Sequence, residues 1–134
     1  LVAVLGWLLA HYFASQRALA NERRKLRTQY LIEAYRRIGT AHSLLRPDHG
    51  CYDEGLKLLE SIVFDIQFLG TPEQAKMAKE FANKFVNSGH YDLDELVEDL
   101  RKTLRKELQL EEIFEPIVAL RLNHEKYPIS HART

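Results

Sequence analysis

The chain has 134 residues, enough for one domain with a modest core, and its 46% hydrophobic and 28% charged residues exclude a disordered or collagen-like protein. Lys and Arg together number 19, as do Asp and Glu, which excludes a chain that binds polyanions through its net charge. The single cysteine excludes an internal disulfide framework and a cysteine cluster that would hold zinc.

The charges are segregated along the chain. Between Arg17 and Arg37, seven basic and two acidic residues give a net charge of +5. Between Asp92 and Glu115, nine acidic and four basic residues give a net charge of −5. This separation predicts two surfaces of opposite sign on one small protein.

Residues 1–16 are predicted to form part of a transmembrane helix that anchors the protein. Residues 1–14 contain no Asp, Glu, Lys or Arg. A full span needs about 20 apolar residues, and because the chain begins at Leu1 rather than Met, we expect the upstream part of the span to lie outside this sequence. Trp7, Tyr12 and Phe13 are expected to contact the membrane. The alternatives are a cleaved signal peptide, whose positive charge would precede the apolar stretch, and a buried or partner-bound helix.

A basic juxtamembrane helix is predicted over residues 17–28. Basic residues that directly follow an apolar span are typical of the cytoplasmic side of a membrane. We therefore expect a single-pass protein of the bacterial inner membrane with its folded domain in the cytoplasm. Membrane lipid is the expected partner, and nucleic acid is not favoured. The predicted lipid contacts are Arg17, Arg23, Arg24, Lys25 and Arg27.

Residues 29–110 are predicted to form an antiparallel four-helix bundle, which makes the fold class all-α. The first helix continues from the anchor, because no Pro or Gly interrupts residues 7–38, and Pro47 ends it. Short loops between the helices favour antiparallel neighbours. The core positions of the first helix recur every three or four residues, at Leu26, Tyr30, Ala34, Ile38, Ala41 and Leu45.

The second helix is predicted over residues 51–69 as the central helix of the domain. A second apolar stripe, at Leu58, Phe64 and Phe68, predicts that it is buried on two sides. Gly70 is expected to end the helix in the left-handed conformation. The first stripe consists of Leu56, Leu59, Ile62, Val63, Ile66 and Leu69.

Two capping signals predict the starts of the third and fourth helices. Thr71, Pro72 and Gln74 have the spacing of a capping box with Pro in the first helical position. Asp92 and Glu95 repeat the cap-plus-three spacing. The fourth helix then carries an apolar stripe at Leu93, Leu96, Val97, Leu100, Leu104 and Leu108.

Residues 111–134 are predicted to form an irregular, partly docked tail. Pro116 breaks the helical pattern, and residues 116–122 are too apolar for a free tail. This segment is expected to dock on the bundle or on a partner, which is an unidentified protein or another copy of the chain in a homo-oligomer. The predicted partner-binding residues are Ile117, Val118, Leu120 and Leu122.

Three segments of the chain are similar to a known family. They are residues 29–38 (QYLIEAYRRI), residues 65–75 (DIQFLGTPEQA) and residues 93–110. Together they resemble an uncharacterised family of small bacterial proteins, over roughly residues 7–120 of this chain. The resemblance implies an N-terminal membrane segment, a basic stretch and a helical domain. It implies no activity, catalytic residue or ligand.

Arg37 and His42 carry an alternative hypothesis, because they have the Arg-x4-His spacing of helical ribonucleases of the HEPN type. In such a site the His handles the proton of the attacking 2′-hydroxyl and the Arg stabilises the phosphate charge. Ile38 stands where these ribonucleases have a polar residue. Residues five apart also lie about 140° from each other around a helix, which is poor geometry for one site.

No metal or cofactor is predicted. His42, His49 and Cys51 form the only cluster of soft metal ligands, and the fourth ligand that zinc usually needs is missing from it. The sequence therefore favours a non-enzymatic, membrane-anchored interaction or scaffold subunit of a bacterial inner-membrane assembly. A membrane-tethered ribonuclease that uses Arg37 and His42 is the alternative.

Overall fold

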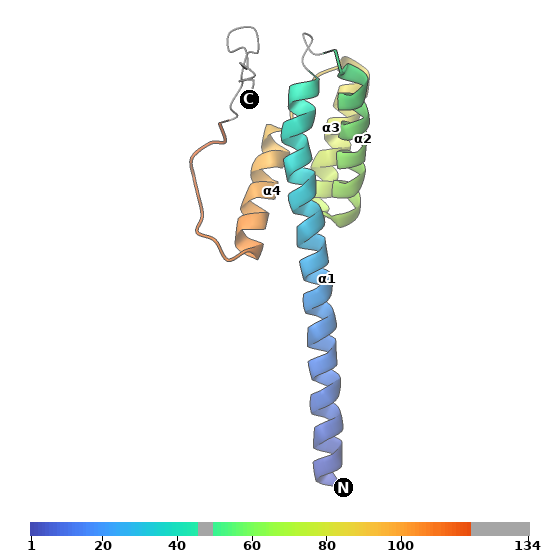
Figure 1. Ribbon diagram of the computed structural model, residues 1–134, viewed down its shortest axis with the longest axis vertical. Coiled ribbons are helices and arrows are strands. Elements are labelled where there is room, and N and C mark those ends of the chain that lie inside the picture. Colours follow the sequence, from blue (N-terminus) through green and yellow to red (C-terminus); the bar gives the residue numbers. More distant parts are fainter. Residues whose placement is uncertain (46–49, 119–134) are drawn as a thin grey trace, which may run out of the picture.

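The computed structural model describes residues 1–45 and 50–118 of the chain. Within these residues it contains four helices and no strand (Figure 1), so the predicted all-α class is confirmed. The helices are α1 (Val2–Leu44), α2 (Tyr52–Leu69), α3 (Pro72–Ser88) and α4 (Asp94–Glu107). Because α1 is one continuous helix of 43 residues, the segments predicted as the anchor, the basic helix and the first bundle helix are a single element.

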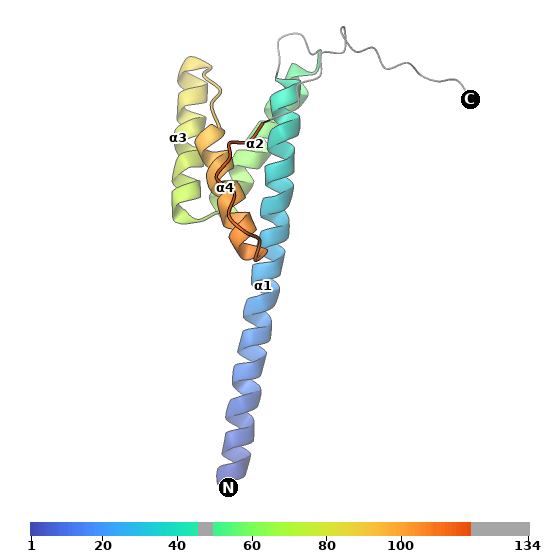
Figure 2. The ribbon, with the colours of Figure 1, turned by 90° about the vertical axis from the view of Figure 1, so that its left-hand side faces the viewer.

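The helices form a ring in which each contacts two neighbours. α1 packs against α2 and α4, and α3 packs against the same two helices. The N-terminal half of α1 projects away from the other three helices in both views (Figures 1 and 2). The bundle therefore involves only the C-terminal half of α1.

Polar contacts show that the neighbours of α1 run antiparallel to it. Arg27 Nε, near the middle of α1, donates to the carbonyl of Leu69 at the end of α2, at 2.7 Å. Arg24 forms an ion pair with Glu107 at the end of α4. At the other end of α1, the ring of His42 lies 5.6 Å from that of Tyr91, just before α4 begins.

The core lies where the four helices meet, and each helix contributes buried apolar side chains. Leu26 and Tyr30 were predicted to lie in this core, but both are exposed, because the packed part of α1 begins one turn later. The buried apolar residues are Leu31, Ala34, Ile38, Ala41, Leu59, Ile62, Val63, Ile66, Ala78, Phe81, Leu93, Leu96, Leu100 and Leu104.

The predicted capping box at the start of α3 is confirmed. Thr71 Oγ1 accepts a hydrogen bond from the N–H of Gln74 at 3.2 Å, and Gln74 Oε1 accepts one from the N–H of Thr71 at 3.0 Å. Pro72 occupies the first helical position. The local sequence therefore determines where this helix begins.

The predicted conformation of Gly70 is wrong. Gly70 has φ −69° and ψ 174°, which is extended and open to any residue. Glycine is needed here for space instead, because a Cβ atom would lie 2.5 Å from the carbonyl oxygen of Ile66 and 3.1 Å from the Cβ of Gln74. The tight α2–α3 connection therefore depends on the absence of a side chain at Gly70.

The predicted start of α4 is also wrong. The helix begins at Asp94, and Leu93 is its N-cap residue with no side-chain hydrogen bond. Asp92 Oδ1 accepts a hydrogen bond from the N–H of Asp94 at 3.1 Å, which forms a local turn before the helix. Because the Leu93 side chain is buried in the core, tertiary packing places an apolar residue where the cap was expected.

The chain reverses direction directly after α4. The N–H of Leu110 donates to the carbonyl of Arg105 at 2.9 Å, and the N–H of Gln109 donates to that of Lys106 at 3.1 Å. These are the two hydrogen bonds of a Schellman motif. Gln109 has φ +55°, a left-handed conformation that costs a non-glycine residue about 1 kcal/mol. The following residues consequently run back along α4.

The second apolar stripe of α2 is not buried, so the prediction of a central helix is wrong. Phe64 is 73% exposed and Phe68 is 80% exposed. Among the described helices, α2 packs against α1 and α3, and neither of these covers the face that carries the two rings. Leu58, the third member of the stripe, is partly buried against the core.

The expected transmembrane helix is not supported. Among the described residues, no helix is both long enough and apolar enough to cross a membrane. α1 has the length, but its uncharged stretch ends at Gln16, and Arg17 is the first of several bases that follow.

Candidate functional site

The N-terminal part of α1, residues 2–22, forms an exposed arm. Every residue from Leu1 to Leu26 is exposed, and Arg24 is the first residue of α1 with a hydrogen bond or ion pair to another described element. Trp7 is 65% exposed, and its ring stacks on that of His11 within the arm. Tyr12 and Phe13 are also exposed and pack edge to face. The three aromatic residues predicted to contact the membrane are thus on an accessible surface.

The five basic residues predicted to contact lipid divide into two groups. Arg17, Arg23 and Lys25 are exposed. Arg24 is exposed as well, but it also forms an ion pair with Glu107 at the end of α4, and Arg27 donates a hydrogen bond to the Leu69 carbonyl at the end of α2. A cation near the carbonyls at a helix C-terminus is stabilising, so Arg27 contributes to the stability of α2 as well as to the basic surface.

The structure does not bring Arg37 and His42 together in one site. Arg37 is half-buried against α2, where it donates to Ser61 and forms an ion pair with Asp65. The ring of His42 instead packs against that of Tyr91, just before α4, with the two ring planes tilted by 48°. The two side chains of the ribonuclease hypothesis therefore contact different elements.

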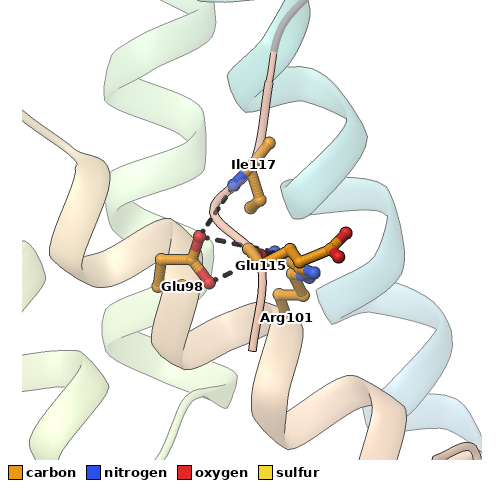
Figure 3. Close-up of polar contacts among 4 residues, drawn as sticks. All are labelled: Glu98, Arg101, Glu115 and Ile117. Atoms are coloured by element: carbon orange, nitrogen blue, oxygen red, sulfur yellow. Dashed lines mark hydrogen bonds and ion pairs between the residues drawn. The ribbon is translucent and has the colours of Figure 1, made fainter. Parts of the chain in front are cut away.

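Residues 111–118 form a strap that lies along α4. Arg105 Nε donates to the Glu111 carbonyl at 2.7 Å, and Arg101 Nη1 donates to the Glu115 carbonyl at 2.8 Å. The N–H of Ile117 donates to Glu98 Oε1 at 3.1 Å. Figure 3 shows Glu98 and Arg101 turned toward these strap residues.

Glu98, Arg101 and Arg105 form a ladder on one face of α4, because residues three or four apart lie on the same side of a helix. Glu98 and Arg101 also lie 3.4 Å apart as an ion pair, which orients the two side chains. All three strap contacts of the ladder are to backbone atoms. The ladder therefore recognises an extended backbone rather than particular side chains.

The strap leaves two hollows beside α4 incompletely filled. One is a groove of about 450 Å³ between α1 and α4, lined by Tyr35, His42, Tyr91, Val97 and Ile117 among others. The second, of about 390 Å³, lies between α3, α4 and the strap, and Met77 and Phe114 line it. Every strap residue is exposed, so the strap buries little apolar surface.

Tyr91 places a buried hydroxyl beside the groove. Its oxygen has no hydrogen-bond partner among the described residues. Burial raises the pKa of this phenol to about 12, with a smaller contribution from the negative charge of Asp94. A buried hydroxyl without a partner is unfavourable, and this one marks the aromatic wall of the groove.

The predicted partner-binding residues are only partly described. Ile117 is 39% exposed and Val118 is 88% exposed, both in the strap, whereas Leu120 and Leu122 lie outside the described residues. Of the three candidate metal ligands, His42, His49 and Cys51, His49 also lies outside the described residues. In the part of the chain that the structure describes, no group of three or more His, Cys, Asp or Glu side chains could hold a metal ion.

The ladder was not predicted from the sequence. The one sequence feature that points to the ladder is the spacing of Glu98, Arg101 and Arg105 on the polar face of the fourth helix, followed by an acidic and apolar segment. Such spacing is ordinary for an exposed helix face. Contacts to backbone atoms leave no pattern in the side chains of the strap.

No family model matches the chain, and no curated protein or solved structure is significantly similar to it. The resemblance to a family of small bacterial membrane-anchored proteins therefore stays a prediction.

Proposed function

We propose that the chain is a non-enzymatic scaffold protein that attaches to a membrane through its arm and presents the bundle to a partner protein. The observation that carries this proposal is the arm itself, a helix that leaves the bundle (Figure 2) and whose apolar residues, spread around the helix, are exposed. A large exposed apolar surface on an otherwise well-packed protein marks an interaction site. Because the apolar residues are not confined to one face, the surrounding medium must be apolar on every side.

The arm is long enough to insert deeply into a bilayer. The apolar residues from Val2 to Phe13 extend about 18 Å along the helix axis, at about 1.5 Å per residue. The hydrocarbon core of a bilayer is about 30 Å thick, so these residues would cover more than half of its thickness. Tyr12 and Phe13 then lie toward the interface, where aromatic rings are favoured.

The exposed bases favour an anionic membrane surface. Arg17, Arg23 and Lys25 follow the apolar residues and are accessible. Each basic residue near an anionic lipid surface contributes about 1 kcal/mol of binding. The same bases support an orientation with the bundle on the cytoplasmic side of a bacterial inner membrane.

The geometry of Arg37 and His42 favours a scaffold role over the ribonuclease hypothesis. Arg37 is engaged by Ser61 and Asp65 on α2, and His42 packs on Tyr91. The two side chains are therefore committed to contacts with different elements, which does not favour a shared phosphate site.

Flotation with lipid vesicles tests the proposal. The unsubstituted chain is expected to float with vesicles that contain phosphatidylglycerol, and to bind less to vesicles of phosphatidylcholine alone. The double variant Leu5→Glu, Leu9→Glu is expected to reduce partitioning by about a hundredfold or more, because burial of each leucine contributes about 2 kcal/mol.

Phe64→Glu, Phe68→Glu is the matched control. These two residues are also exposed, apolar and four positions apart, but they lie on the bundle, and their replacement is expected to leave flotation unchanged. Equal loss of flotation in both double variants would show that the vesicles bind exposed apolar side chains without preference for the arm. Failure of the unsubstituted chain to float would overturn membrane attachment.

A further inference from the structure

We propose that residues 119–122 (Ala-Leu-Arg-Leu), which follow directly on the strap and lie outside the described residues, bind in the groove between α1 and α4 of their own chain. The proposal goes beyond the scaffold function, because it concerns how the bundle is completed and does not depend on membrane attachment. It assigns the groove to a segment of this chain rather than to another protein.

The strap runs along α4 in a direction that leads into the groove. Figure 1 shows the strap beside α4, running from the end of this helix toward its start. Its contacts step from Arg105 to Arg101 and then to Glu98 as the strap advances to Ile117. Glu98 and Ile117 themselves line the groove. The residues that come next in the chain are therefore delivered to this space.

The length of the segment matches the remaining length of the groove. Asp94, at the start of α4, lies four residues before Glu98, which is about 6 Å along the helix axis, and Tyr91 lies beyond it. An extended chain advances about 3.3 Å per residue. Continued in the same direction from Ile117, the segment reaches the level of Asp94 at residue 119 and the rings of His42 and Tyr91 at residues 120–122.

The composition of the segment is complementary to the groove. The walls of this space of about 450 Å³ are mainly apolar or aromatic and include Tyr35, Ile38, His42, Tyr91, Leu93 and Val97. The two carboxylates of the groove are those of Asp94 and Glu98. Glu98 is paired with Arg101, whereas Asp94 is exposed and has no ion pair with another described residue. Leu120 and Leu122 supply apolar side chains, and Arg121 between them supplies the opposite charge.

Covalent attachment favours this segment over a segment of another protein. A short flexible connection gives a tethered group an effective concentration of the order of millimolar at its site. A competing protein at about micromolar concentration would have to bind the groove about a thousandfold more tightly. Leu120 and Leu122 then complete the bundle instead of binding a partner, and Phe64 and Phe68 on α2 remain as exposed apolar residues.

The rate at which a cysteine in the groove reacts with a maleimide tests the proposal, in the full chain with Cys51→Ser in detergent micelles. Gly39→Cys places the thiol on the α1 wall, where an added Cβ atom meets no neighbouring side chain within 4 Å. The double substitution Leu120→Asp, Leu122→Asp is expected to raise the labelling rate at least about tenfold, because two acidic side chains would not stay in an apolar groove beside Asp94.

Thr40→Cys is the matched control for labelling. Thr40 is the next residue of α1, and it is exposed and does not line the groove. Its labelling rate is expected to be the same with and without the double substitution. An unchanged labelling rate at Gly39→Cys would overturn the proposal. An equal increase at both cysteines would also overturn it, because the protection would then come from the bundle as a whole.

A disulfide locates the segment directly. With oxidised glutathione, Gly39→Cys, Leu120→Cys is expected to form a disulfide within the chain at least about tenfold faster than Phe64→Cys, Leu120→Cys, whose first cysteine lies on the exposed face of α2. Equal rates would contradict binding in the groove. A disulfide between two chains, seen as a doubled mass without reductant, would assign the groove to a second copy and overturn the proposal. Because neither measurement uses vesicles, failure of membrane attachment is separately visible.

Discussion

At the scale of single residues, Tyr91 combines favourable packing with an unfavourable hydroxyl. Its ring contacts those of His42, Phe81 and Phe85, with centroids 5.6, 5.8 and 6.4 Å away. Its oxygen is buried without a partner in the described part of the chain. The aromatic contacts therefore hold the residue in place at the cost of a desolvated polar atom.

The pH dependence of stability is expected to report this burial. Because the pKa of Tyr91 is raised from 10.0 to about 12 in the folded chain, the unfolded state loses this proton first as the pH rises. The protonated phenol of Tyr91 makes its full contribution to the free energy of unfolding below pH 10. This contribution is lost between about pH 10 and pH 12.

Tyr91→Phe is expected to remove this step and to leave stability at neutral pH within about 1 kcal/mol, since it deletes a hydroxyl that has no partner. Urea unfolding from pH 8 to pH 11.5 checks both points. An unchanged pH profile in the variant would show that other groups cause the alkaline loss. Tyr12→Phe, on the exposed arm, serves as the control.

At the scale of helices, Gln74 links the start of α3 to α4. It is fully buried. Beyond the capping box, its Nε2 donates to Asp99 Oδ2 at 2.7 Å and to Thr103 Oγ1 at 3.0 Å. One side chain thus satisfies an N-terminal backbone group of α3 and two polar groups of α4, which sets how these helices pack.

Gln74→Ala is expected to lower the free energy of unfolding by about 2–3 kcal/mol, because it removes several buried hydrogen bonds and leaves Asp99 without its partner. Chemical denaturation monitored by circular dichroism gives this value. Gln67→Ala is the control, since Gln67 is exposed and bonds only to a carbonyl of its own helix. A loss in Gln74→Ala no larger than in Gln67→Ala would contradict the linking role.

The helical elements were predictable to different degrees for a physical reason. The start of α3 followed from Thr71, Pro72 and Gln74, because a capping box involves only residues three apart. The start of α4 did not, because the core contact of Leu93 outweighed a local cap at Asp92. Likewise, the sequence pattern shows that α2 has two apolar faces, but not that one of them lacks a neighbouring helix.

At the scale of the whole molecule, the chain has a packed bundle and an unpacked arm joined by one continuous helix (Figure 1). Arg24 lies eleven positions after Phe13, which is about 16 Å along the helix axis at 1.5 Å per residue. If the arm inserts as proposed, this length holds the bundle above the lipid headgroups, where it stays accessible to a partner.

Amide hydrogen exchange is expected to separate the two parts. Most helical stability in proteins comes from tertiary packing, so the amides of residues 5–22 are expected to exchange about a thousandfold or more faster than those of residues 31–41 in the bundle. Addition of phosphatidylglycerol vesicles is expected to slow exchange in the arm only. Equal protection along the whole of α1 without lipid would show that the arm is packed in solution.

The sequence alone determined the helical class, the capping box of α3 and the order of apolar, basic and acidic segments, because these depend on residues close together in the chain. Tertiary structure decided which of the basic residues bind other helices, as Arg24 and Arg27 do, and separated Arg37 from His42. It also placed the strap on Glu98, Arg101 and Arg105. These outcomes depend on which surfaces meet across the bundle and on backbone atoms that every residue shares, so side-chain patterns do not reveal them.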